Sequence, residues 1–242
     1  MTPTHNRHGE RLDLSFHPGQ GASCHPDHLV ILGHGVTGNK DRPLLIAVAE
    51  HLAANGWPCL RLSFSGNGES EGAFADSNIS KEIEDLTAVI DQHGPGKKIA
   101  YIGHSMGGAV GTLTAARDER IQLMVHLAGM VHTSNFVERE FGELTPDHDL
   151  MWDEAACPLS STYVNDLRQV DSTLDAVKEL RLPWLLIHGL DDDVVLPGDS
   201  QELYQKLRAP RELVEIPGAD HSFEGYHHEV CTKILDWLEK HF

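Results

Sequence analysis

The chain has 242 residues and a formal net charge of −18 at pH 7, with 40% of its residues hydrophobic and 23% charged. A chain of this length can bury a full core, and its acidic surface argues against nucleic acids and anionic membranes as partners. No stretch approaches the roughly 20 apolar residues of a membrane span, and the polar start of the sequence lacks the apolar segment of a secretory signal, so we expect a cytoplasmic location.

Short apolar runs alternate with segments of helical periodicity along most of the chain. The apolar runs predict strands near residues 10–16, 28–35, 57–66, 97–105, 121–129, 182–189 and 211–218. The helical patterns cover residues 43–55, 80–93, 106–117, 199–208 and 224–241. This alternation indicates a mostly parallel sheet with helices on both faces, and the first strand is expected to add an antiparallel edge. We therefore predict a single α/β domain over residues 1–242, with its chemistry beyond the carboxyl ends of the strands.

One segment interrupts the alternation. Residues 130–181 separate two predicted strands and are too many for an unstructured loop in a compact domain. We expect a small, mostly helical cap insertion over the active edge of the sheet. Its larger apolar residues either line a substrate pocket or form the cap's own core, and the core is the preferred interpretation. These residues are Phe136, Phe141, Met151, Trp152 and Tyr163.

The stretch Gly103-His104-Ser105-Met106-Gly107 follows a predicted strand and opens a predicted helix. In this context the pattern G-x-S-x-G predicts a nucleophile elbow, a strained turn that presents the serine for attack. Glycine on either side lets the turn clear the neighbouring strand and helix, and the helix start directs N–H groups toward the serine. The alternative is a glycine-rich turn with an uninvolved serine, which the flanking strand and helix make the weaker interpretation.

A serine nucleophile needs a histidine base and an acid that orients it, and an elbow predicts the chain order serine, acid, histidine. His221 follows the last predicted strand and is the predicted base for Ser105. Asp220, beside it, is interpreted as a turn residue. Three consecutive aspartates follow the preceding strand, and the residues alone leave the choice among them open. They are Asp191, Asp192 and Asp193.

Acyl transfer also needs hydrogen-bond donors for the oxyanion of the tetrahedral intermediate. One predicted donor is the backbone N–H of Met106, directly after the serine, and the other is the N–H of Val36 in the loop after the first buried strand. His34 is expected to hold that loop by hydrogen bonding and to take no part in proton transfer. His104 and His188 are interpreted as structural residues near the site.

Cysteine and histidine give no sign of a metal site. The four cysteines are far apart without metal-type spacing, and the 17 histidines are scattered. We therefore expect no metal and no cofactor, and we expect the cysteines to be buried free thiols. They are Cys24, Cys59, Cys157 and Cys231.

The sequence resembles the serine α/β-hydrolases, and within them the small bacterial carboxylesterases that include cinnamoyl (feruloyl) esterases. The matching stretches are GHGVTGNKDRP, LRLSFSGNGESEGAF, ISKEIEDLTAVID, IGHSMGG, HGLDDDVVLPGDS and IPGADHSFEG, spread from Gly33 to Gly225. In that family the acid stands three residues after the glycine of the strand-end HG and precedes x-V-V, which implies Asp192 as the acid here. Leu196 stands where the family usually has proline. The cap is the family's variable part, and none of its residues matches a known substrate contact.

The resemblance and the motifs together predict a serine carboxylesterase acting through an acyl-enzyme. Its substrates are expected to be short-chain or aromatic esters, hydroxycinnamoyl esters among them. The same triad could instead serve a thioesterase, an acyltransferase or a small peptidase. A non-catalytic protein that binds small molecules on the same fold is a further alternative. A small-molecule ester is the expected partner, and homodimer formation is left open.

Overall fold

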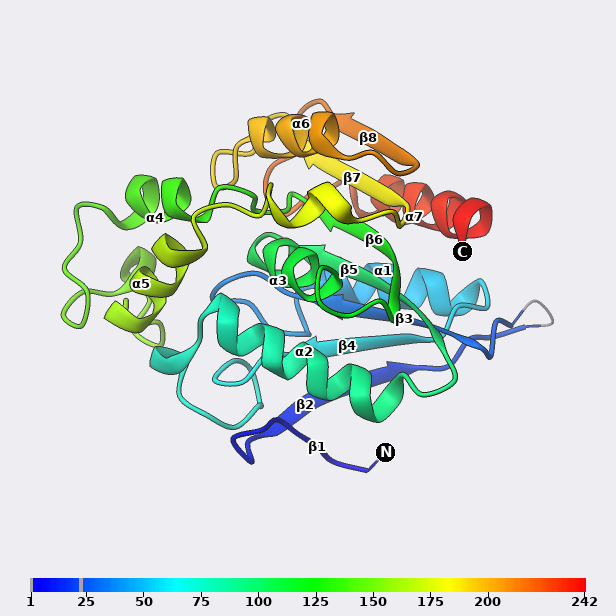
Figure 1. The fold of residues 1–242 in the computed structure, drawn as a ribbon, viewed down its shortest axis with the longest axis horizontal. Coiled ribbons are helices and arrows are strands. Elements are labelled where there is room, and N and C mark those ends of the chain that lie inside the picture. The colour runs from blue at the N-terminus through cyan, green and yellow to red at the C-terminus, as the bar shows by residue number, and fades with distance from the viewer. Residues whose placement is uncertain (1, 22–23) are drawn as a thin grey trace.

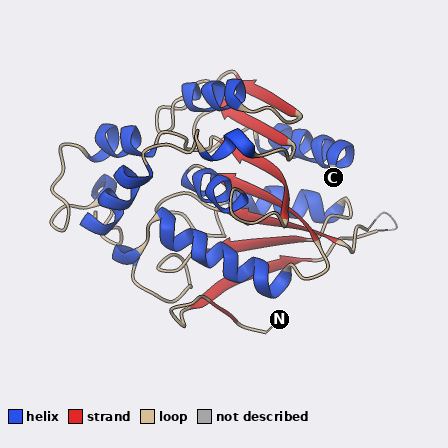
Figure 2. Ribbon diagram, in the orientation of Figure 1, coloured by secondary structure: helices blue, strands red, loops and turns tan. Residues whose placement is uncertain are grey.

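The computed structural model describes residues 2–21 and 24–242, which build one sheet with helices on both faces (Figure 1, Figure 2). Within these residues the sheet has eight strands in the order β1-β2-β4-β3-β5-β6-β7-β8. The pairings from β4 to β8 are parallel, whereas β2 pairs antiparallel with both β1 and β4. The strands are β1 (Thr4–His5), β2 (Arg11–His17), β3 (His28–Gly33), β4 (Cys59–Ser63), β5 (Lys98–His104), β6 (Ile121–Leu127), β7 (Trp184–Gly189) and β8 (Arg211–Ile216).

Helices cover both faces of the sheet, which is why its central strands are mostly apolar. Leu29 and Ile31 of β3 pack in one buried cluster with residues of α2 and α3, whereas Val30 and Leu32 pack in a second cluster with α1 and α7. This division follows the two-residue period of a strand. The helices of the two layers are α1 (Pro43–Ala54), α2 (Ile79–His93), α3 (Met106–Ala115), α6 (Pro197–Lys206) and α7 (His227–His241).

The predicted elements are present, with ends shifted by a few residues. The first predicted strand is β2, and it is antiparallel as expected. It is not the edge, however, because the two-residue strand β1 pairs outside it through Thr4 and His5. A strand of two residues is too short to leave a periodic pattern in the sequence.

The long segment between β6 and β7 holds α4 (Thr133–Phe141), η2 (Met151–Asp153), α5 (Ser161–Val170) and η3 (Ala176–Glu179). Figure 1 shows α4 and α5 beyond the carboxyl ends of the strands. Four of the five large apolar residues of this cap are buried, and they belong to the same cluster as residues of α2 and α3. The preferred core interpretation is therefore confirmed for them, although their core is continuous with the main one. It is wrong for Trp152, which is 40% exposed.

The cysteines are free thiols as predicted, and Cys59, Cys157 and Cys231 are buried. Cys24 is exposed, which corrects the prediction for that residue. It lies in the loop between β2 and β3, and loops run over the protein surface. No helix in the described ranges is long and apolar enough to cross a bilayer.

Candidate active site

Ser105 lies between β5 and α3, at the carboxyl edge of the central strands (Figure 1). Its backbone has φ 54° and ψ −124°, a positive-φ conformation that residues other than glycine rarely adopt. Strain of this kind costs about 1–3 kcal/mol and persists only where the surrounding structure imposes it. The turn around Ser105 is therefore the strained strand-to-helix turn that the sequence predicts.

Glycines make the close packing around this turn feasible. A Cβ atom at Gly103 would lie 2.4 Å from the carbonyl oxygen of Gly107, and one at Gly107 would lie 2.6 Å from that of His34. A Cβ atom at Gly35 would lie 2.6 Å from the Cβ atom of Ser105. Any side chain at these three positions would force backbone apart, so the glycines are required by contact with neighbouring segments.

The imidazole of His221 donates from Nδ1 to Oδ2 of Asp192 at 2.8 Å. Asp192 is 4% exposed, and its Oδ1 accepts the backbone N–H groups of Val194 and Val195 at 2.9 Å each. Burial acts to raise the pKa of Asp192, but hydrogen bonds from His188, His221 and the Val195 amide outweigh it and hold the pKa well below its usual value. The carboxylate is therefore ionised throughout the neutral range and faces the imidazole.

His188, predicted as a structural residue near the site, is a second partner of this carboxylate, a contact that the sequence did not predict. It is fully buried, and its Nε2 lies 3.3 Å from Oδ2 of Asp192 while donating to the carbonyl oxygen of Val195 at 2.8 Å. Its Nδ1 accepts from the hydroxyl of Ser200 at 2.7 Å. The prediction that His188 is a structural residue is confirmed, and its contacts hold the loop that carries Asp192. The sequence signal for His188 is its position in the His-Gly pair at the end of β7.

The other acidic candidates lie elsewhere. Asp191 and Asp193 are exposed. Asp220 accepts the backbone N–H groups of Ser222 and Glu224, which confirms it as a turn residue. The structure therefore brings Asp192, and neither of its two neighbours, to the histidine.

His104 holds His221 through a hydrogen bond to its backbone. Its Nε2 donates to the carbonyl oxygen of His221 at 2.9 Å, and the two rings lie 4.8 Å apart. Burial and the neighbouring His221 lower the pKa of His104 to about 3. It therefore remains neutral at physiological pH and acts as a structural donor, as predicted.

His34 holds the loop that follows β3. Its Nδ1 donates to the carbonyl oxygen of Gly35 at 2.8 Å, and its Nε2 accepts the backbone N–H of Phe64 at 3.0 Å. Burial lowers the pKa of His34 to about 4, so the ring stays neutral and keeps this pair of roles. The predicted structural function of His34 is confirmed.

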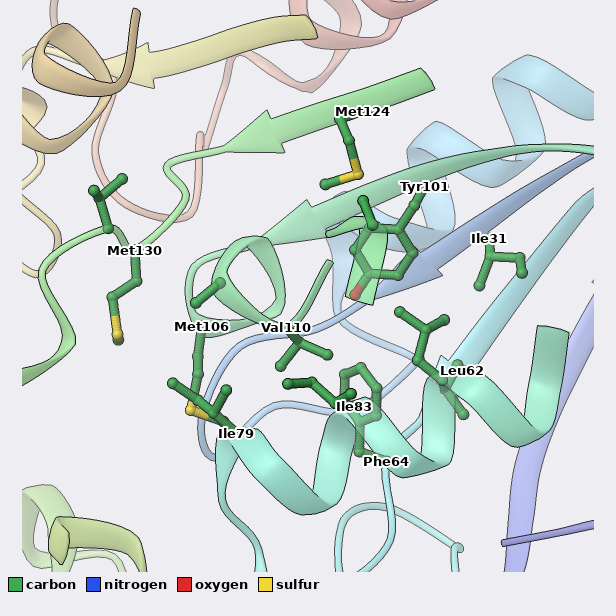
Figure 3. Close-up of a cluster of buried hydrophobic side chains, with 14 of the residues drawn as sticks. Ile31, Leu62, Phe64, Ile79, Ile83, Tyr101, Met106, Val110, Met124 and Met130 are labelled. Carbon is green, nitrogen blue, oxygen red and sulfur yellow. The ribbon is translucent and has the colours of Figure 1, made fainter. Parts of the chain in front are cut away.

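The two predicted oxyanion donors belong to this loop and to the elbow. Val36 lines the same pocket as Ser105, and Met106 is the first residue of α3. Within the described residues the Val36 N–H donates to no backbone carbonyl. Met106 begins α3, where the first N–H groups of a helix have no partner within the helix. The Met106 side chain packs in the buried cluster with Ile79 of α2 and anchors the helix start there (Figure 3).

Ser105 and His221 line one cavity of about 580 Å³. The predicted oxyanion loop (residues 34–38), the start of α1 and the segment before α7 form most of its wall, and Trp152 of the cap and Val194 complete it. The only Lys or Arg among the lining residues is Arg42, which also donates to the carbonyl oxygen of Thr37. No cluster of three or more potential metal ligands occurs within residues 2–21 and 24–242. The cavity thus brings the hydroxyl of Ser105, the imidazole of His221 and the backbone of Val36 to one place.

The family described as alpha/beta hydrolase fold matches residues 28–159, more than half of the chain. The chain belongs to this family. A second family, described as serine aminopeptidase S33, matches residues 147–225. The predicted α/β-hydrolase fold, with its mostly parallel sheet and helical cap, is confirmed, and membership supports hydrolase activity.

Two curated relatives and one solved structure illustrate the likeness. "Alpha/beta hydrolase domain-containing protein WAV2" of Arabidopsis thaliana is 30% identical over 172 residues, which cover 66% of this chain and 53% of the relative. "Palmitoyl-protein thioesterase ABHD10, mitochondrial" of Homo sapiens is 25% identical over 176 residues, covering 67% and 56%. The chain thus spans about half the length of these curated relatives. Est1E from Butyrivibrio proteoclasticus, solved with ferulic acid, has a TM-score of 0.86 and 24% identity, with 96% of each chain covered. The resemblance to feruloyl esterases is confirmed at the level of fold.

Proposed function

We propose that this α/β-hydrolase is a serine carboxylesterase that hydrolyses esters with short or aromatic acyl groups. The observation that carries the proposal is the 2.8 Å hydrogen bond between His221 and Asp192 in a pocket that also contains the strained Ser105. The Nδ1 proton of His221 is committed to the carboxylate, so its Nε2 is available to accept a proton.

In the proposed reaction, the Ser105 oxygen attacks the ester carbonyl carbon while His221 takes the hydroxyl proton. The backbone N–H groups of Val36 and Met106 stabilise the oxyanion. When the intermediate collapses, the alcohol leaves with the proton from His221 and an acyl-enzyme remains. Water then gives a proton to His221, adds to the acyl carbon, and releases the acid as Ser105 recovers its proton. Asp192 orients the imidazole and stabilises its charged form.

The pocket supports the aromatic part of the proposal. A cavity of about 580 Å³ suits a small-molecule ligand. The indole of Trp152 on its wall offers a flat apolar surface to an aromatic acyl group. The fold is also that of Est1E, whose solved structure contains ferulic acid. Methyl ferulate is therefore the aromatic ester to test first.

Thioester hydrolysis is the second candidate. ABHD10 is named a palmitoyl-protein thioesterase, and it is 25% identical to this chain. The same nucleophile, base and oxyanion donors would act on a thioester, because the acyl carbon and its developing oxyanion are alike in the two substrates. The leaving group and the length of acyl chain that the pocket accepts separate the two functions.

The test measures hydrolysis of p-nitrophenyl esters from acetate to long acyl chains, with methyl ferulate and an acyl-thioester alongside, by wild type and Ser105→Ala. We expect turnover that peaks at short chains or at ferulate and disappears in Ser105→Ala. Turnover confined to the thioester would favour the second candidate. No turnover of any substrate by folded wild-type protein would contradict the proposal and favour a small-molecule binding protein.

A further inference from the structure

Trp152 lines the active-site pocket and has an unfavourable backbone conformation. Its φ and ψ are 48° and 35°, and the next residue, Asp153, also has a positive φ of 59°. Two successive non-glycine residues in the left-handed region are uncommon, and contacts elsewhere must hold them there. The contacts that hold Trp152 therefore bear directly on the shape of the pocket.

Those contacts come from the end of helix α4. The indole packs edge-on against Phe141, with ring centroids 4.9 Å apart, and its Nε1 donates to Oε2 of Glu140 at 3.2 Å. The other oxygen of Glu140 accepts from Nε of Arg139 at 3.0 Å. The Glu140 side chain is 16% exposed and lies between the partly exposed side chains of Arg139 and Trp152, so it joins the two.

Arg139 continues the chain of contacts to Val194, another residue that lines the pocket. Its Nη2 donates to the carbonyl oxygen of Val194, and its guanidinium lies over the ring of Phe136, 5.7 Å from the centroid. Val194 itself lines the pocket, and its N–H donates to Oδ1 of Asp192 at 2.9 Å. One adjacent pair of cap residues thus holds the tryptophan on one side and the loop of the proposed acid on the other.

We propose that Arg139 and Glu140, here called the cap latch, are positioning residues that set the width of the substrate pocket and hold the loop of the acid. Because Glu140 contacts the indole, it controls how the pocket accepts an aromatic acyl group. Because Arg139 holds the Val194 peptide, its loss also disturbs Asp192. The kinetic part of this inference rests on the proposed esterase function.

The kinetic test compares p-nitrophenyl acetate with methyl ferulate. In Glu140→Ala we expect KM for ferulate to rise about fivefold to tenfold, with kcat for acetate within about twofold of wild type. In Arg139→Ala we expect kcat to fall about tenfold or more for both esters, because a small displacement of the acid propagates to the base. Glu140→Gln, which keeps an oxygen for the indole N–H, should restore most of the ferulate KM.

Iodide quenching of tryptophan fluorescence provides a test that needs no activity. Trp152 is 40% exposed, while the other three tryptophans are at most 4% exposed, so a quencher in solution reports on Trp152. Its quenching constant should rise in Glu140→Ala and Arg139→Ala. The matched control is Arg168→Ala, which removes an exposed ion pair with Glu138 between α4 and α5 and touches no part of the pocket.

The outcomes separate the latch from the esterase function. Increased quenching with the predicted split between kcat and KM supports the latch. Quenching and kinetics that match Arg168→Ala in both latch variants would overturn it. If wild type hydrolyses no ester but the quenching still rises in the latch variants, the esterase proposal fails while the positioning of Trp152 stands.

Discussion

The two walls of the active-site pocket are held by different means. The wall formed by the sheet is fixed by close packing of the backbone: a Cβ atom at Gly103 or Gly107 would lie within 2.6 Å of a backbone oxygen, and one at Gly35 would lie 2.6 Å from the Cβ atom of Ser105. The wall formed by the cap is fixed by side chains, and the ion pair of Arg139 with Glu140 is at its centre. Backbone contacts permit almost no substitution, whereas side-chain contacts can be exchanged. The geometry for chemistry and the geometry for substrate choice are therefore separable in this fold, except at Arg139, which also holds the Val194 peptide of the sheet wall.

Backbone strain is present on both walls of the pocket. Ser105 takes its positive φ between a central strand and a buried helix, while Trp152 takes its positive φ in a short 3₁₀ turn. The first is enclosed by the core, and the second depends on a few cap contacts. Substitutions on the sheet wall should therefore affect all substrates, whereas substitutions of Trp152 and Glu140 on the cap wall should affect some.

The largest effect on the sheet wall is expected for Asp192→Asn. The amide cannot stabilise a charged His221 and can favour the wrong tautomer, so kcat for p-nitrophenyl acetate should fall by about 10³–10⁴-fold. The control is Asp193→Asn, which changes an exposed neighbour and should leave kcat within about twofold. Equal losses in the two variants, or a loss confined to Asp193→Asn, would refute the assignment of the acid.

Gly35→Ala tests the backbone packing itself. Its methyl group would lie 2.6 Å from the Cβ atom of Ser105, so the elbow or the oxyanion loop must move, and kcat/KM should fall about 100-fold for every ester. Gly198→Ala is the matched control, because no atom lies within 4 Å of its added carbon. A Gly35→Ala enzyme with wild-type kcat/KM would show that the glycine contact does not set the site.

Trp152→Ala tests the cap wall. Removing the indole should raise KM for methyl ferulate about tenfold, through lost aromatic contact, and should change kcat/KM for p-nitrophenyl acetate by no more than about twofold. Trp152→Phe, which keeps a ring against Phe141, should lie between wild type and alanine. Equal losses for both esters would mean that the cap wall contributes to the chemistry and that the two walls are not separable.

The smallest expected effect is on the stability of the fold and comes from Glu82, a buried carboxyl group in α2. Burial, and then the charge of Asp85, raise the pKa of Glu82 well above its ordinary value of 4.5. The native state therefore binds this proton more tightly than the unfolded state. The contribution to stability is fully present below pH 4.5 and is lost as pH rises toward the native pKa.

Glu82→Gln removes this dependence while keeping an oxygen for the Ser77 hydroxyl. The thermal midpoint of the variant should exceed that of wild type at pH 8, by about 2–4 °C for each kcal/mol gained, and the difference should shrink at pH 5. A difference that is equal at the two pH values, or larger at pH 5, would contradict the expectation.

Much of the sheet wall could be predicted from the sequence because its signals are local. Gly103 and Gly107 lie within two residues of Ser105 in the chain. Asp192 and His221 each follow an apolar run that predicts a strand. The cap wall could not be predicted in this way. Trp152 looked like its buried neighbours, and the contact of Arg139 with Val194 joins positions 55 residues apart. Similarly, nothing local shows that β1 pairs outside β2, or that His188 shares the carboxylate of Asp192 with His221.

The most direct test of the central claim is labelling with a fluorophosphonate probe, followed by mass spectrometry of the peptide that contains Ser105. We expect covalent labelling at Ser105 of folded wild-type protein and none in a folded Ser105→Ala variant. Folded wild-type protein that remains unlabelled, or equal labelling of the two proteins, would contradict it.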